Sequence, residues 1–139
     1  MAKALGDARK IVVSRQQLQF TWRNSEQLTG DLVEAVTALK NESGDTNIAM
    51  SGSVSIVRQL LGAGLLDELH LLVHPIAVRA GARLFDEGDP IPLTLISSET
   101  FETGVLNLVY GPADTVGDAG YEDAKVHLAQ SDPTSQRPR

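Results

Sequence analysis

The chain has 139 residues, a formal net charge of −6, 42% hydrophobic residues and no cysteine. This length suits one domain with its own core. The missing cysteines exclude disulfides, zinc–thiolate sites and cysteine nucleophiles, and the acidic balance argues against nonspecific nucleic-acid binding. No apolar run reaches the roughly eighteen residues of a membrane span. The first ten residues have no apolar core and are not a secretion signal. The absence of cysteine fits the cytoplasmic location that we expect.

Residues 10–15, KIVVSR, are predicted to form the first strand. Three consecutive apolar residues are typical of a parallel strand that is buried on both faces. Ser14 and Arg15 stand at its carboxyl end, where open α/β sheets bind ligands. An arginine in this place could pair with a 2′-phosphate, although a plain surface arginine explains the same pattern.

Further along, strands and helices are predicted to alternate. Residues 16–29 form a polar connection in which Trp22 is interpreted as covering the edge of the core. A helix is expected over residues 30–41, a strand over 47–50, and a second helix from Val54. This order is typical of βαβ crossovers onto a mostly parallel sheet.

The turn at residues 51–53 joins the predicted strand directly to the second helix. Gly52 adds no side chain, and Ser53 falls at the N-cap position. The free N–H groups of the first helical turn would suit a phosphate or pyrophosphate. An ordinary capped helix explains the same residues, and Gly64 is its expected stop signal.

The later part of the chain is predicted to contain a strand over residues 69–76 and a hairpin, at the sheet edge, of residues 93–101 and 105–110. His70 and His74 lie roughly 13 Å apart along the first of these strands, too far to bind one ion, so no metal site is expected. Residues 113–139 are predicted to be a disordered tail, in which residues 121–130 could form one or two helical turns.

Many short elements, taken together, carry a family resemblance over about residues 9–112, and residues 1–112 are expected to form one partial α/β domain. They are Gly52-Ser53, Leu60-Leu61, Gly64-Leu65, Asp67-Glu68-Leu69, His74-Pro75, Arg83-Leu84-Phe85, Phe101, Gly104 and Tyr110. In order and spacing they resemble the C-terminal reductase domain of the riboflavin-biosynthesis deaminase-reductase, within the dihydrofolate-reductase-like superfamily.

The resemblance implies a three-layer α/β fold and a reductase that passes a hydride from NADPH to a pyrimidine- or pterin-like small molecule. It implies contacts to the cofactor's adenosine end from Ser14 and, by extension, Arg15. It implies pyrophosphate binding at the residues that match the family's turn, which are Gly52, Ser53, Val54 and Ser55. No catalytic residue is assigned by it.

Three departures from the family separate this chain from its relatives. Met50 stands where the riboflavin reductases have an acidic substrate contact, and Arg79 replaces the first of two loop glycines. The family's first strand, helix and strand have no counterpart in this chain, so little turnover is expected. The strand edges that these elements would cover are then open, which favours a homodimer.

A noncatalytic remnant that binds nucleotide or only self-associates is the alternative to a reductase. A general α/β interaction module is the third reading.

Overall fold

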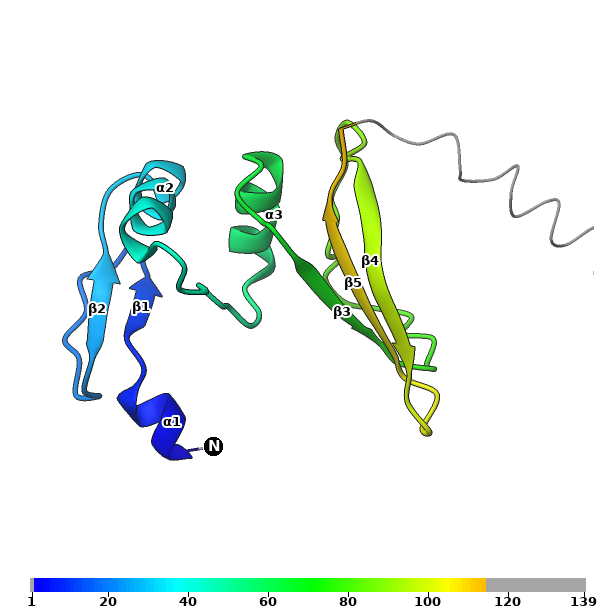
Figure 1. Cartoon of the computed structure of the whole chain (residues 1–139), viewed down its shortest axis with the longest axis horizontal. Coiled ribbons are helices and arrows are strands. Elements are labelled where there is room, and N and C mark those ends of the chain that lie inside the picture. The colour runs from blue at the N-terminus through cyan, green and yellow to red at the C-terminus, as the bar shows by residue number, and fades with distance from the viewer. Residues whose placement is uncertain (1, 115–139) are drawn as a thin grey trace, which may run out of the picture. The chain divides into compact units, whose positions relative to one another are not determined.

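The computed structural model describes residues 2–114, and the chain divides into two compact units, Met1–Leu65 and Leu66–Arg139. The first unit contains α1 (Ala2–Asp7), β1 (Lys10–Val13), β2 (Ser25–Leu28), α2 (Leu32–Ser43) and α3 (Val54–Gly62) (Figure 1). The second contains β3 (Leu69–Val73), β4 (Leu93–Thr100) and β5 (Leu106–Pro112).

The first strand is confirmed as β1, but it ends at Val13, and its residues are half-buried or exposed instead of buried on both faces. It pairs in parallel with β2, from Lys10 opposite Ser25 to Val13 opposite Leu28. The prediction of a polar connection over residues 16–29 is wrong at residues 25–28, which form β2. Side-chain bonds hold this polar strand in place, because Gln27 donates to the carbonyl oxygens of Ser14 and Gln16. Tertiary contacts thus override the low strand propensity of its residues.

Helix α2 is confirmed, and its start has a clear physical cause. The carboxylate of Asp31 accepts hydrogen bonds of 3.0 Å from the backbone N–H groups of Val33 and Glu34. These bonds satisfy two of the donors that a helix leaves without partners at its N-terminus. Near the end of α2, the ammonium group of Lys40 donates to the carbonyl oxygen of Leu65, which joins α2 to the chain after α3.

Helix α3 is confirmed as well, and it ends in a Schellman motif. Gly64 has φ +67°, its N–H donates to the carbonyl oxygen of Leu61, and the N–H of Leu65 donates to that of Leu60. Leu60 and Leu61 are buried. The stop signal therefore fixes the end of a helix whose apolar face is covered.

The strand predicted at residues 47–50 is absent. These residues have no regular secondary structure, and Ile48 and Met50 are 47% and 42% exposed. In the described part of the first unit, the sheet consists of β1 and β2 alone. An apolar run becomes a strand only when a neighbouring strand pairs with it.

The expectation of a mostly parallel sheet is also wrong. The second unit holds a three-stranded antiparallel sheet in the order β3-β5-β4. The hairpin of β4 and β5 is confirmed. Of its two strands, however, only β4 lies at an edge of the sheet, because β5 lies in the middle, between β3 and β4 (Figure 1). Parallel neighbours were inferred from the alternation of strands and helices, and two of the elements behind that inference were misplaced.

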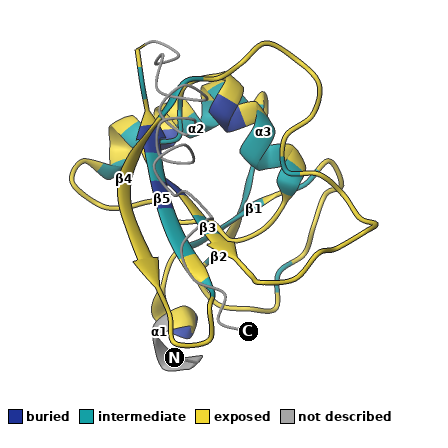
Figure 2. Ribbon diagram, turned by 90° about the vertical axis from the view of Figure 1, so that its right-hand side faces the viewer, coloured by how far each residue is buried: buried dark blue, intermediate teal, exposed yellow. Residues whose placement is uncertain are grey.

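Burial is greatest at a few apolar positions. The buried hydrophobic residues are Leu39, Leu60 and Leu61 in the first unit and Leu69 and Val109 in the second. Strand β4 is exposed along most of its length, whereas β5 is half-buried or buried from residue 107 to residue 111 (Figure 2). The central strand is therefore the best-covered element of its sheet.

Two expectations fall on residues that are not described. The predicted tail, with its helical turns at residues 121–130, lies outside the described residues from position 115 onward. Among the helices that are described, none has the length and apolar character that a membrane span requires.

Candidate nucleotide-binding site

The turn before α3 has an unusual backbone. Gly52 and Ser53 both have positive φ angles, +84° and +53°, and Ser53 adopts the left-handed helical region at the N-cap position. Its side chain makes no capping hydrogen bond. Its carbonyl oxygen instead accepts from Ile56 and Val57, at 3.0 and 3.1 Å. The N-terminus of α3 is thus organised by backbone geometry, unlike that of α2.

This geometry leaves the start of α3 suited to an anion. The first N–H groups of a helix have no intrahelical acceptor, and here no N-cap side chain accepts from them. The positive end of the helix dipole lies at the same place. A phosphate oxygen at this turn would receive backbone hydrogen bonds from Val54 and Ser55 and could also bond the Ser53 hydroxyl.

Gly52 keeps the approach to this turn open. A Cβ atom built at this position would meet no atom within 4 Å, so the space beside the backbone is empty of protein. Its φ of +84° lies where L side chains are strained. Glycine is therefore required by the backbone conformation, and its small size leaves room for a ligand.

Ser14 and Arg15 lie at the end of β1, as predicted, in a turn tied to β2. The Ser14 hydroxyl accepts from the backbone N–H of Gln16 at 3.1 Å, and its carbonyl oxygen accepts from Gln27. Arg15 is exposed. Among the described residues, no hydrogen bond joins Ser14 or Arg15 to the turn at residues 52–55.

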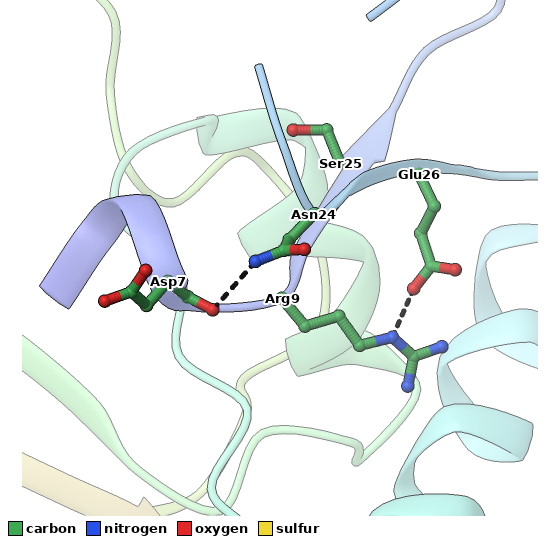
Figure 3. Close-up of a pocket in the computed structure, with 5 residues that line it drawn as sticks. All are labelled: Asp7, Arg9, Asn24, Ser25 and Glu26. Carbon is green, nitrogen blue, oxygen red and sulfur yellow. Dashed lines mark hydrogen bonds and ion pairs between the residues drawn. The ribbon is translucent and has the colours of Figure 1, made fainter. Parts of the chain in front are cut away.

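A shallow, open depression of about 430 Å³ lies between α1 and β2 and was not anticipated from sequence. Its lining residues are Asp7, Arg9, Asn24, Ser25 and Glu26 (Figure 3). Sequence offered no signal for it, because its residues come from two stretches, 7–9 and 24–26, that lie far apart in the chain.

The charges around this depression are satisfied by one another. Arg9 pairs with Glu26 and Glu42, and the hydrogen bond that Arg9 donates to the Glu26 carboxylate is the main reason that the pKa of Arg9 is raised. Arg23 pairs with Asp7, and the Asn24 amide donates to the Asp7 carbonyl oxygen at 3.0 Å. An anion would have to displace two carboxylates from Arg9. We therefore assign these residues a structural role.

Met50 and Arg79, the two single residues at which this chain departs from the family pattern, lie in different structural settings. Met50 is 42% exposed in the irregular segment before the turn. Arg79 lies in an exposed loop and keeps a negative φ, whereas Gly81, two residues later, has φ +141°. The left-handed position in this loop is thus filled by a remaining glycine. Arg79 changes the charge of the loop without straining it.

His70 and His74, the two histidines that the structure describes, do not belong to a metal-binding cluster. His70 lies 2.8 Å from the Glu68 carboxylate, and both side chains are exposed. Across residues 2–114 there is no cluster of three or more His, Cys, Asp or Glu side chains that could hold an ion.

Comparison with known proteins shows where these features belong. The model of the RibD C-terminal domain family matches residues 3–107. The uncharacterized protein YyaP of Bacillus subtilis is 30% identical over 109 residues, which are 78% of this chain and 57% of that protein. The chain therefore spans little more than half the length of this relative.

Two solved structures share the fold. A protein assigned to riboflavin biosynthesis from Shewanella sp. PV-4 superposes with a TM-score of 0.63 at 21% identity, over 74% of this chain and 59% of its own. A pyrimidine reductase-like protein from Corynebacterium diphtheriae gives 0.53 at 20% identity, over 66% and 39%. At these identities the likeness concerns the fold. The family match spans both units and the turn at α3, and on this ground the chain belongs to the RibD C-terminal domain family.

Proposed function

We propose that this chain is a reductase of the RibD C-terminal type that binds NADPH with the pyrophosphate at the N-terminus of α3. The observation that carries this proposal is the turn of Gly52 and Ser53, with two consecutive left-handed residues, no side-chain cap and open space beside the glycine. Membership of a reductase-like family supports the choice of ligand.

The residues present fit such a cofactor. Backbone N–H groups at residues 54 and 55 and the Ser53 hydroxyl would hold the pyrophosphate. Ser14 keeps its hydroxyl proton as a donor, since its oxygen is used as an acceptor by Gln16. Exposed Arg15 is free in space to reach a 2′-phosphate, which its planar guanidinium would bind in a bidentate manner.

When bound, NADPH supplies the hydride, and the substrate is proposed to be a pyrimidine- or pterin-like small molecule. The protein's own task is to position the cofactor. The Schellman motif at Gly64 and the buried residues Leu60 and Leu61 fix α3, and hence the turn in front of it. A rigid turn binds phosphate with less loss of conformational entropy.

The first test is a pair of glycine variants. Gly52→Ala places a methyl group in the open space where the phosphate would approach. The methyl group should cost the phosphate one charge-assisted hydrogen bond, which is worth about 1.5–3 kcal/mol. We therefore expect NADPH to bind tenfold or more weakly. Gly44→Ala is the matched control, because Gly44 also has a positive φ and open space but lies after α2. Calorimetric titration measures both affinities.

Both variants should lose a similar amount of stability, on the order of 1 kcal/mol, because both force alanine into a left-handed backbone. Only Gly52→Ala should lose affinity. Equal affinities of the two variants, both matching the unmodified chain, would exclude the turn as the pyrophosphate site.

A second candidate function is nucleotide binding without turnover. It is favoured by Met50, which stands in an irregular, exposed segment where a strand and an acidic substrate contact were expected. Hydride transfer requires the reacting atoms to be held roughly 3–3.5 Å apart, and small displacements cost orders of magnitude in rate. Following NADPH absorbance with the ribosylamino-pyrimidine and with dihydrofolate distinguishes the two: steady oxidation indicates a reductase, and binding without oxidation indicates the second function.

A further inference from the structure

Residues 14–18, called the 14–18 segment below, follow β1 and are held in place by side chains. They have no regular secondary structure, and among the backbone–backbone hydrogen bonds of the described loops and turns none involves residues 15–18. The Ser14 hydroxyl accepts from the backbone N–H of Gln16, which is a bond within the segment itself. The bonds that tie the segment to the sheet come from one residue of β2, Gln27.

Gln27 uses both ends of its side-chain amide on this segment. Its Nε2 donates to the carbonyl oxygens of Ser14 and Gln16, at 3.0 and 2.7 Å. Its Oε1 accepts from the backbone N–H of Leu18 at 3.0 Å. Gln27 is half-buried and lies opposite Val12 in the pairing of β1 with β2, so the three bonds start from a strand whose position the pairing fixes.

Glutamine suits this place better than chemically related residues. Its planar amide has two N–H donors and an oxygen acceptor, and here both donors and the acceptor are used. With the amide turned over, its oxygen would face two carbonyl oxygens and its NH₂ group would face an N–H, so only one orientation satisfies the segment. Asparagine is a methylene shorter, and glutamate lacks the donors.

Arg15 lies between two residues whose carbonyl oxygens both accept from Gln27. Its side chain is exposed and, among the residues that the structure describes, makes no hydrogen bond or ion pair. A guanidinium binds a phosphate in a bidentate manner only when the backbone presents it at the right place and in the right direction. Anchors on both sides of Arg15 reduce the conformational freedom that binding would otherwise remove.

We propose that Gln27 is a positioning residue for the cofactor, which holds Ser14 and Arg15 in the arrangement that binds the 2′-phosphate of NADPH. It thereby determines the preference for NADPH over NADH, which lacks this phosphate. The inference rests on the proposed function, in which these two residues contact the adenosine end of the cofactor. Gln27 acts through them and does not itself touch the cofactor.

The test compares the dissociation constants of NADPH and NADH, measured by calorimetric titration of full-chain variants. Gln27→Met keeps the length of the side chain and removes all three bonds. It should weaken NADPH binding roughly tenfold, as the loss of one hydrogen bond to the phosphate would, and change NADH binding much less. Gln17→Met is the matched control, because Gln17 is exposed in the same segment and its side chain makes no hydrogen bond among the described residues. It should leave both affinities unchanged.

A double-mutant cycle with Arg15→Gln separates positioning from a general structural role. Arg15→Gln removes the guanidinium and should by itself weaken NADPH binding by a similar factor. If Gln27 acts through Arg15, Gln27→Met should have little further effect in the Arg15→Gln background. A merely structural role would weaken NADPH and NADH alike and would add to the effect of Arg15→Gln, and that result overturns the proposal.

Hydrogen exchange tests the three bonds of Gln27 without any cofactor. The amide proton of Leu18 is bonded to Gln27, so it should exchange several-fold faster in Gln27→Met than in Gln17→Met or the unmodified chain. Gln27→Glu, which keeps the acceptor for Leu18 but lacks the donors, is a second variant should Gln27→Met not fold, and it should lower the preference for NADPH in the same direction.

The proposed function and the role of Gln27 fail in different ways. NADPH affinity that is insensitive to Gly52→Ala contradicts the pyrophosphate site. Where Gly52→Ala weakens binding but both Gln27 variants keep the full preference for NADPH over NADH, only the role of Gln27 is overturned. An unmodified chain that binds NADPH and NADH equally well overturns it too.

Discussion

At the scale of single residues, the backbone angle of Ser53 distinguishes α3 from an ordinary capped helix. The sequence predicted the N-cap position of Ser53 correctly, from its place between an apolar run and the helical spacing of residues 54–61. It carried no signal for the left-handed φ of +53°, because serine rarely adopts this conformation. Such strain is retained where surrounding structure enforces it, often at binding sites.

Ser53→Gly should separate stability from binding. Replacing serine by glycine removes left-handed strain of about 1–2 kcal/mol. The greater freedom of glycine in the unfolded chain offsets up to about 1 kcal/mol of this gain, so the free energy of unfolding should stay level or rise slightly. NADPH affinity should fall several-fold with loss of the hydroxyl. Urea unfolding and calorimetric titration measure the two quantities. A variant of lower stability and unchanged affinity would show that the serine is structural.

Lys10 is a second residue whose role the sequence did not reveal. Its ammonium group donates to the carbonyl oxygens of Leu5, Gly6 and Ala8, and it lies 4.7 Å from the centre of the Trp22 ring. Trp22 is 56% exposed, so it lies beside Lys10 at the surface, and the expectation that it covers the core edge was wrong.

At the scale of elements, Lys10 therefore joins α1 to β1 and to the connection before β2. Lys10→Met keeps the apolar stem but removes the bonds to the carbonyls and the cation over the ring, at a cost of about 1–2 kcal/mol. Trp22 is the only tryptophan, so its fluorescence should change in this variant. Lys40→Met, which removes the bond to Leu65 instead, should leave the emission of Trp22 unaltered. Identical emission spectra for Lys10→Met and the unmodified chain would contradict the contact.

Helices were predicted more accurately than strands, and the reason is physical. Asp31 and Gly64 mark helix ends through local bonds that a short stretch of sequence contains in full. Strands depend on partners elsewhere in the chain. Hence β2 was missed, although Gln27 anchors it to the segment after β1, and residues 47–50 were predicted as a strand without a neighbour to pair with.

At the scale of the whole molecule, the family resemblance was the most reliable inference from sequence, because it combined many weak signals over a long span. The RibD C-terminal match over residues 3–107 confirms it. Whether neighbouring strands run parallel or antiparallel could not be derived in the same way, since the order of elements in the sequence does not determine which strands become neighbours.

The central claim, that NADPH binds at the start of α3, is tested most directly by amide-resolved NMR of the full chain during titration with NADPH. The largest shifts should fall on the backbone N–H groups of Val54 and Ser55, with smaller ones at Ser14 and Arg15. The residues lining the depression at Arg9 should not respond, because its charges are already paired. Shifts centred on that depression, or no shifts at residues 52–55 at saturating NADPH, would contradict the account.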